Sequence, residues 1–223
     1  MPEVHEAART AAIAVNGDGT IEVMKPQVEP ATKVNVRELS RTLARAFFDD
    51  PVTVWMLPDE KVRAARLPLV FATMTRYHHL AGGGVEIARG DSGIGAAALW
   101  DPPGRWRESR LEEWAMIPSM LRVFGFGSAR VRKLQEIMRL VHPEEPHWYL
   151  AAIGSDPEVR GTGFGQALMR SGLERADREH APAYLESSKA ENIGYYERFG
   201  FEVIAEIAPP GGPSLWPMWR SPR

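Results

Sequence analysis

The stretch DPEVRGTGFGQAL, residues 156–168, constrains the fold more than any other part of the chain. It follows the apolar run HWYLAAIG (147–154), which predicts a strand buried on both faces, and it leads into a helical pattern over 163–179. Three glycines in five positions favour a tight turn rather than a packing element. Because the strand pattern AYLES (183–187) follows the helix, this unit predicts one βαβ crossover.

The remaining segments predict an α+β fold with a mixed, mostly antiparallel central sheet flanked by helices. Strand patterns cover 20–29, 85–90, 94–100 and 201–208, the last before a Pro/Gly turn and a tail. Asn35 and Glu38 have the spacing of a helix capping box, and a second helix runs through 67–77. Amphipathic patterns between about 102 and 146 predict a helical insert, whose first helix is bent near Pro118. The motif ENIGYYERFG (191–200) predicts a short helix.

Domain organisation is predicted to be simple. No Gly/Ser-rich or charge-run linker divides the chain, so residues 19–223 are expected to form a single domain. Residues 1–18 read as a loosely ordered N-terminal segment. The turn-prone residues 16–19 leave a hairpin open as the alternative.

Composition excludes several classes of function. A net charge of −2 does not indicate a nucleic-acid or anionic-membrane surface. The chain has no cysteine, which excludes disulfides, thiolate metal sites and a thiol nucleophile. No apolar run approaches the ~18 residues of a membrane span, and the N-terminal apolar stretch is too short for a signal peptide. A cytoplasmic protein is therefore the expectation.

A strand, a glycine turn and a helix together are the layout of an anion site. The first backbone N–H groups of a helix lack internal partners, and glycines let a phosphate approach them. Arg160 adds a positive charge beside the turn, although a tight turn with no ligand is the alternative. A P-loop is excluded, because Gln166 and Ala167 follow Gly165. A dinucleotide fingerprint would use Glu186 as its acid, but Gln166 replaces its last glycine and too few strands follow.

The third ligand class is the pyrophosphate of coenzyme A, and here the motifs resemble a known family. R-x-x-G-x-G, from Arg160 to Gly165, resembles the coenzyme A motif of the GNAT acetyltransferase superfamily. The block ENIGYYERFGFEV (191–203) resembles the later helix-and-strand block of that family. The stretches TLARAFFDDP, HWYLAAIGSDP, AYLESS, YYERFGF and GGPSLWPM resemble, in order, its puromycin N-acetyltransferase-like members. The resemblance runs from about Val28 to the C-terminus.

The resemblance implies a GNAT acyltransferase fold and an acetyl-CoA-dependent N-acetyltransferase that works without a covalent enzyme intermediate. It also implies the residues that bind acetyl-CoA. The pyrophosphate would meet the backbone of seven consecutive residues: Arg160, Gly161, Thr162, Gly163, Phe164, Gly165 and Gln166. The pantetheine arm would pair with Ile153, Gly154 and Ser155, which requires the two strands to separate after Gly154, and Asn192 would bond it from the other side.

Four residues are candidates for proton transfer. Tyr196 is the implied general acid and also contacts the cofactor, and Tyr195 is its rival. A phenol stays protonated at neutral pH and can protonate a departing thiolate. His147 and Glu186 are the two candidates for the base. An ordinary structural role is the alternative for each of them.

His78 and His79 form a superficial metal motif. Adjacent residues of a helix point in different directions, and no third ligand follows at suitable spacing. The sequence therefore predicts helix-surface histidines, and no metal is expected.

Acceptor recognition is expected in the first half of the chain. An aromatic cleft would suit a planar or cationic amine, and five tryptophans are its candidates: Trp100, Trp106, Trp114, Trp148 and Trp216. We interpret the sequence as that of an enzyme that acetylates a primary amine of a small molecule, as a monomer or homodimer without a nucleic-acid partner. The alternatives are a protein lysine or N-terminal acetyltransferase, a non-catalytic CoA-binding regulatory module and, most remotely, a nicotinamide-dependent oxidoreductase.

Overall fold

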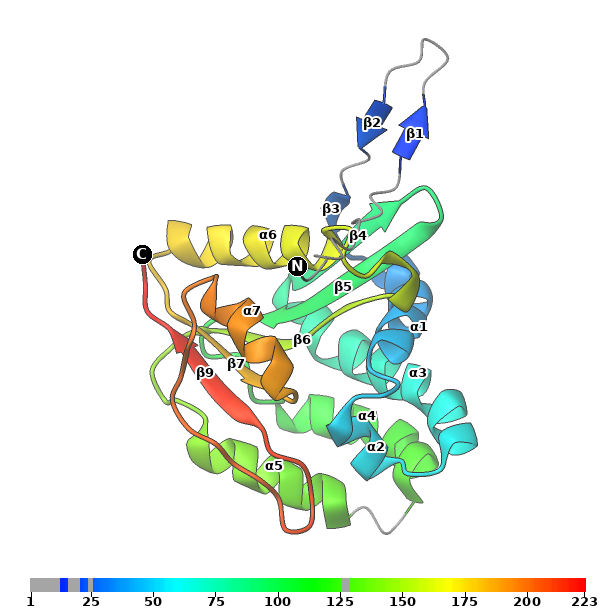
Figure 1. The fold of residues 1–223 in the computed structure, drawn as a ribbon. Helices are drawn as coiled ribbons and strands as arrows, with labels where there is room; N and C mark the ends of the chain where they lie inside the picture. Colours follow the sequence, from blue (N-terminus) through cyan, green and yellow to red (C-terminus); the bar gives the residue numbers. More distant parts are fainter. Residues whose placement is uncertain (1–12, 16–20, 24–25, 126–128) are drawn as a thin grey trace, which may run out of the picture.

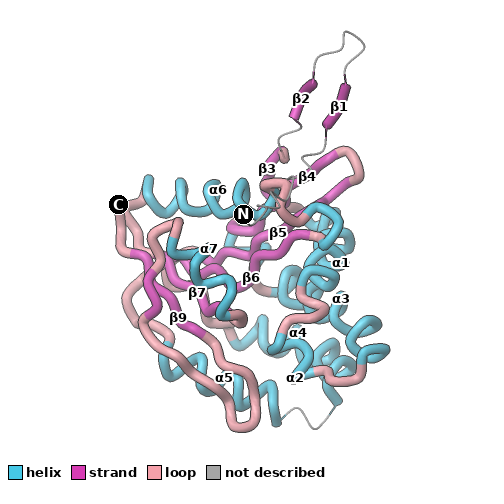
Figure 2. Tube along the Cα trace, in the orientation of Figure 1, coloured by secondary structure: helices cyan, strands magenta, loops and turns pink. Residues whose placement is uncertain are grey.

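The computed structural model describes residues 13–15, 21–23, 26–125 and 129–223 (Figures 1 and 2). Its main sheet has seven strands in the order β3-β4-β5-β6-β7-β9-β8. Their bounds are β3 Gln27–Pro30, β4 Gly84–Gly90, β5 Gly93–Asp101, β6 Trp148–Ser155, β7 Ala183–Ser187, β8 Glu202–Val203 and β9 Trp216–Arg220. β6 and β7 run in parallel, and the other neighbours in this sheet are antiparallel. The predicted mixed, mostly antiparallel sheet is confirmed.

Helices cover both faces of this sheet (Figure 1). The α-helices are α1 Val36–Ala46, α2 Pro51–Met56, α3 Glu60–Tyr77, α4 Arg110–Phe124, α5 Ala129–Val141, α6 Phe164–Arg178 and α7 Ile193–Glu197. Among the described residues, short 3-10 helices are η1 Lys33–Asn35, η2 His79–Gly82, η4 Pro157–Val159 and η5 Ala190–Asn192. The expected helical insert is formed by α4 and α5, with Pro118 inside α4. A separate antiparallel pair joins β1 Ile13–Val15 to β2 Ile21–Val23.

The two faces of the sheet carry two hydrophobic layers. Along β5, Ala96, Ala98 and Trp100 pack with residues of α6, such as Leu168. Ala97 and Leu99 point the other way and belong to the layer with α1 and α3. This period of two places apolar residues on both faces of a central strand. The sheet is therefore enclosed between α6 on one side and α1 with α3 on the other.

The C-terminal strands differ from the sequence prediction. The expected strand 201–208 shrinks to β8, because Val203 and Ile204 are exposed and bury nothing against the sheet. The segment read as a tail forms β9, which pairs with both β7 and β8 and buries Met218 completely. Long-range pairing, which no local pattern reveals, decides which of the two segments becomes the longer strand.

Three local predictions are also corrected. The expected strand 20–29 is two strands, β2 and β3. Asn35 does not cap α1 with its side chain but accepts from the N–H of Thr32 at 2.8 Å, and Glu38 accepts from the N–H of Ile94 at 2.8 Å instead of closing a capping box. β6 alternates between buried and partly exposed residues rather than being buried on both faces.

None of the described helices is both long and apolar enough to span a membrane.

Replacing Gly172 by alanine is expected to destabilise the fold. A Cβ at Gly172 would overlap the indole ring of Trp100, which is fully buried and has no room to move. Overpacking of this kind costs roughly 1–3 kcal/mol, against about 1 kcal/mol gained in helix propensity. Urea unfolding should therefore show a net loss in the free energy of unfolding.

Gly194→Ala is the matched control, because the same substitution in α7 meets only one atom, at 4.0 Å. The control should unfold at the same urea concentration as the parent, or slightly above it. Equal stability of the two variants would contradict the close packing of α6 on Trp100.

Candidate functional site

The candidate site begins where β6 and β7 separate. Their parallel pairing ends at Leu150 and Leu185, although β6 continues to Ser155. The pairing with β5 shifts register at the same point, which leaves Ala151 as the extra residue of a bulge in β6. Beyond it, β6 pairs with β5 alone, so its other edge has no strand partner in the described part of the chain.

The separation therefore comes earlier than predicted. The sequence placed it after Gly154, but Ile153, Gly154 and Ser155 all lie beyond the break and pair with β5. Glycine is required at position 154 for another reason, the close packing of α1 on β6. A Cβ there would lie 2.7 Å from the Cβ of Ala46 and 3.0 Å from the Phe47 ring, so glycine lets α1 approach the sheet.

The glycine turn presents uncapped backbone amides. Gly161 and Gly163 have φ of +82° and +95°, in the left-handed region that favours glycine, and a Cβ at either would meet no atom within 4 Å. No side chain caps α6, and the N–H of Ala167 is the one that bonds to the carbonyl of Gly163. The preceding amides of α6 therefore lack both a side-chain cap and a partner within the helix, and they lie at the positive end of the helix dipole.

Not every residue of the turn is free for a ligand. The N–H of Arg160 bonds to the Pro157 carbonyl at 3.4 Å, and the N–H of Thr162 bonds to the Val159 carbonyl at 3.3 Å. The guanidinium of Arg160 donates to the carbonyl of Ala46 at 2.9 Å, at the C-terminal end of α1. In this structure the Arg160 side chain fastens the turn to α1.

Arg45 and Asp156 hold the turn in place, and sequence reasoning missed both. Asp156 is buried and accepts from Nε of Arg45 at 2.6 Å and from the N–H of Glu158 at 3.1 Å. Its own N–H donates to the carbonyl of Gly95 at 2.8 Å. The Asp-Pro pair at the start of the turn is a common helix-start signal that could have revealed this role.

α7 carries two adjacent tyrosines, Tyr195 and Tyr196. Tyr195 and Tyr196 lie 5.4 Å apart between ring centroids, and an ideal Cβ on Gly165 would lie 3.9 Å from the hydroxyl of Tyr195. Burial raises the pKa of Tyr195 to about 12. Burial also raises the pKa of Tyr196 above its usual value, with Tyr195 and Asp50 adding to the effect. Both phenols therefore hold their protons at neutral pH. Asn192, the N-cap of α7, is exposed.

A cleft of about 510 Å³ opens beside the residues that precede α7, because Ala190 and Glu191 line it. Three loops line it, 49–51, 188–191 and 213–216, and its polar residues include Asp49, Lys189 and Glu191. Asp50 ties two of these loops together, because it caps α2 and also accepts from the hydroxyl of Ser188. Trp216 contributes an aromatic wall.

The five tryptophans do not form the expected aromatic cleft. Trp100 and Trp148 are core residues, whereas Trp114 is 73% exposed on α4. Trp106 stacks on His142, with 3.6 Å between ring centroids. Only Trp216 of the five lines the cleft.

His147 and Glu186 are brought together through His142, which sequence reasoning missed. Nδ1 of His147 lies 2.6 Å from the Glu145 carbonyl, and its Nε2 lies 3.1 Å from Nε2 of His142. The other ring nitrogen of His142 lies 3.6 Å from Glu186. Burial lowers the pKa of His147 to about 4. His142 lowers this pKa further, whereas the hydrogen bond to the Glu145 carbonyl raises it by less than burial lowers it. This imidazole is therefore neutral at pH 7.

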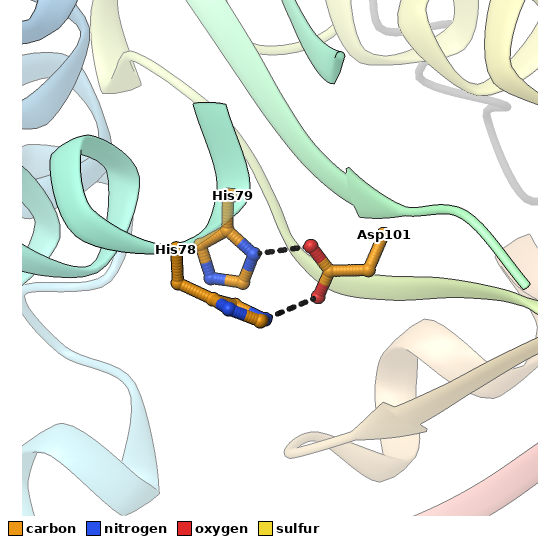
Figure 3. Close-up of side chains that lie close together, drawn as sticks. All are labelled: His78, His79 and Asp101. Carbon is orange, nitrogen blue, oxygen red and sulfur yellow. Dashed lines mark hydrogen bonds and ion pairs between the residues drawn. The ribbon is translucent and has the colours of Figure 1, made fainter. Parts of the chain in front are cut away.

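The two adjacent histidines are not on a helix surface, so that prediction is wrong. His78 ends α3 and His79 begins η2, and both are buried against Asp101, the last residue of β5 (Figure 3). Burial alone would raise the pKa of Asp101, but His79 and His78 lower it to about 2. Burial alone would lower the pKa of His78, but Asp101 raises it. The sequence missed this cluster because Asp101 is brought near by the sheet.

Comparison with known proteins agrees with this geometry. The sequence model of the acetyltransferase (GNAT) family matches residues 122–201, which include the glycine turn and α7. An uncharacterized N-acetyltransferase of Schizosaccharomyces pombe is 27% identical over 180 residues, covering 74% of this chain and 70% of that protein.

Solved structures share the fold. The crystal structure of histone acetyltransferase HPA2 and related acetyltransferase from Corynebacterium glutamicum superposes with a TM-score of 0.71 and 29% identity, covering 90% of this chain and 98% of that one. Arylalkylamine N-acetyltransferase 2 from Aedes aegypti superposes with a TM-score of 0.59 and 16% identity, covering 89% and 99%. The chain has the GNAT fold, and residues 122–201 carry the sequence pattern of the acetyltransferase (GNAT) family.

Proposed function

We propose that this protein transfers the acetyl group of acetyl-CoA to a primary amine of a small molecule, by direct attack within a ternary complex. One observation carries the proposal. The uncapped amides at the start of α6 lie next to the unpaired edge of β6, so one strand end offers both an anion site and a peptide-like edge. A diphosphate attached to an amide-containing arm matches this pair of features.

The turn fits such a group without rearrangement. Gly161 and Gly163 leave open the space that side chains would fill, so a phosphate can approach the amides there. The backbone amides between Gly161 and Gln166, apart from that of Thr162, would hold the pyrophosphate. Ile153 to Ser155 would bond the arm, and Asn192 would bond it from the start of α7. Bound acetyl-CoA supplies an activated thioester and leaves as a thiol.

Tyr196 is proposed to hold the proton that the leaving sulfur needs. Its partly buried phenol keeps that proton at neutral pH, and the pKa is raised in part by Asp50, which stands in sequence between the cleft residues Asp49 and Pro51. Tyr195 also keeps its proton, but its hydroxyl lies toward Gly165 and the glycine turn. We therefore assign Tyr195 to packing and cofactor contact.

Glu186 is proposed as the base, with His147 in a positioning role. Both ring nitrogens of His147 already face partners, the Glu145 carbonyl and His142, so neither nitrogen is free to meet an amine directly. Glu186 carries a carboxylate beside His142, which can relay a proton.

The acceptor is proposed to bind in the cleft lined by loops 49–51, 188–191 and 213–216. Asp49 and Glu191 would attract a cationic amine, and Trp216 offers an aromatic face. The similarity to an arylalkylamine N-acetyltransferase and the puromycin N-acetyltransferase-like motifs support a small aromatic amine. The name of the C. glutamicum protein favours protein acetylation as the second candidate.

An acceptor screen tests the proposal. The purified protein is incubated with acetyl-CoA and a panel of aminonucleosides, arylalkylamines, aminoglycosides, polyamines and lysine peptides, and free thiol is measured. Amine-dependent thiol release with a small molecule supports the proposal. Release with peptides alone would favour protein acetylation, whereas acetyl-CoA binding without release would favour a regulatory module.

Gln166→Glu is expected to weaken acetyl-CoA binding without loss of stability. Glutamate in the first turn of α6 suits the helix dipole, but its charge would face the diphosphate. Repulsion on the order of 1 kcal/mol should raise KM for acetyl-CoA roughly 5–10-fold. Gln135→Glu, on the exposed side of α5, is the control and should leave KM unchanged. An unchanged KM in Gln166→Glu would contradict the placement of the diphosphate.

Tyr196→Phe should lower kcat and kcat/KM together, by on the order of 100-fold, because the proton donor acts in the transition state. Tyr195→Phe is the matched control on the same helix and should keep most of kcat. Thiol-release kinetics with the best acceptor from the screen measure both. If the losses are reversed between the two tyrosines, their assigned roles are wrong.

His147 should make stability depend on pH. Its folded pKa of about 4 lies below the ordinary value of about 6.5, so the unfolded chain binds more protons between these values and stability falls as pH drops through that window. His147→Gln should reduce this slope by up to about one proton, as measured by urea unfolding at several pH values. His180→Gln, at an exposed position, should leave the slope unchanged. If the slope in His147→Gln equals that of the parent, His147 is not held neutral.

A further inference from the structure

A second group of polar side chains, separate from the glycine turn, is formed by His78, His79 and Asp101 (Figure 3). Each imidazole faces a different oxygen of one carboxylate. Nδ1 of His79 lies 2.8 Å from Oδ1 of Asp101, and Nε2 of His78 lies 3.5 Å from Oδ2. The exposed fractions are 4% for His78, 3% for His79 and 1% for Asp101. The end of α3, the start of η2 and the end of β5 thus bring polar side chains together at one buried position.

Hydrogen bonds within the described chain do not satisfy this cluster. Four of its buried atoms have no hydrogen-bond partner there: Nδ1 and Nε2 of His78, Nε2 of His79 and Oδ2 of Asp101. Each unpartnered buried polar atom costs free energy, on the order of 1–3 kcal/mol. His78 makes only long contacts, 3.5 Å to Oδ2 of Asp101 and 3.4 Å to Glu112, and Nε2 of His79 has no partner, so this cluster has room in its bonding for a ligand.

The geometry suits a single cation. One ligand atom from each of His78, His79 and Asp101 can be chosen so that all three lie within 4.8 Å of one another. Two imidazole nitrogens and one carboxylate oxygen form a set that divalent transition metals use, whereas Mg²⁺ and Ca²⁺ prefer oxygen ligands alone. We propose that His78, His79 and Asp101 bind one Zn²⁺-type divalent cation.

Glu112 of α4 supplies the support that such a site needs. Its Oε2 lies 3.4 Å from Nδ1 of His78, on the ring edge opposite Asp101. A ligating histidine commonly offers its second nitrogen to a carboxylate, which fixes the ring and its tautomer. A proton on Nδ1 directed at Glu112 leaves Nε2 of His78 free for the ion. Glu112 is thus a positioning residue.

The proposed ion has a structural role and does not depend on the acetyltransferase proposal. It would join the end of α3 and the end of β5, and Glu112 would extend the connection to α4 of the insert. A cation bound to the folded chain alone stabilises that chain.

Calorimetric titration of the chelator-treated full-length protein with ZnCl₂ tests the proposal. One ion per chain is expected for the parent and for His180→Gln, a control that removes an exposed histidine. Asp101→Asn and His79→Gln should lose this binding, and Glu112→Gln should weaken it about 10–100-fold. Absence of one-to-one binding in the parent, or binding retained in both ligand variants, would overturn the proposal.

Thermal unfolding and Co²⁺ spectroscopy of the parent protein test the same proposal without relying on a variant that folds. At 100 times its dissociation constant, ZnCl₂ should raise the Tm of the parent by about 5–10 °C. Co²⁺ bound to the parent should show the visible bands of a low-coordinate nitrogen and oxygen site, and ZnCl₂ should abolish them. A parent Tm insensitive to ZnCl₂ and a featureless Co²⁺ spectrum would also overturn it, whatever the variants do.

Discussion

The separation of β6 from β7 is the constraint on which the candidate site depends. Two parallel neighbours stop sharing hydrogen bonds after Leu150 and Leu185, while the bulge at Ala151 keeps β6 paired with β5. A strand edge released in the middle of a sheet needs another partner or water. Because the glycine turn follows the same strand, one irregularity creates both the free edge and the approach to the amides of α6.

α1 keeps this opening in a fixed shape. Gly154 lets α1 lie directly on the released part of β6, and the ion pair of Arg45 with Asp156 fastens the beginning of the glycine turn. Arg160 adds a bond to the last carbonyl of the same helix. A partly buried ion pair is costly to leave half-made, so the loss of one partner would free the turn as well as the helix. The site is therefore rigid because three separate contacts meet at the C-terminal end of α1.

The parts of the fold that the sequence could predict are those with strong local signals. The glycines fix the turn, the period of the apolar residues fixes α6 and the insert, and the parallel pair follows from the crossover. What depends on distant partners could not be predicted. Val203 and Met218 both suit a strand, and only the pairing with β7 makes the second one central. The bulge at Ala151 leaves no mark in the apolar run. Asp101 is 22 residues from His79 in the sequence, so no spacing rule joins them.

Asp101 of the proposed cation site and Glu186, the proposed base, both act on the pKa of one phenol, that of Tyr149. This shared phenol links the two proposals physically. Asp101 stands opposite Tyr149 in the pairing of β5 with β6. Burial raises the pKa of Tyr149, and Glu186 and Asp101 add to that effect. Tyr149 thus lies between the carboxylate that would bind a cation and the carboxylate proposed as base. A cation beside Asp101 would offset one of the two negative charges near this phenol while leaving the glycine turn untouched.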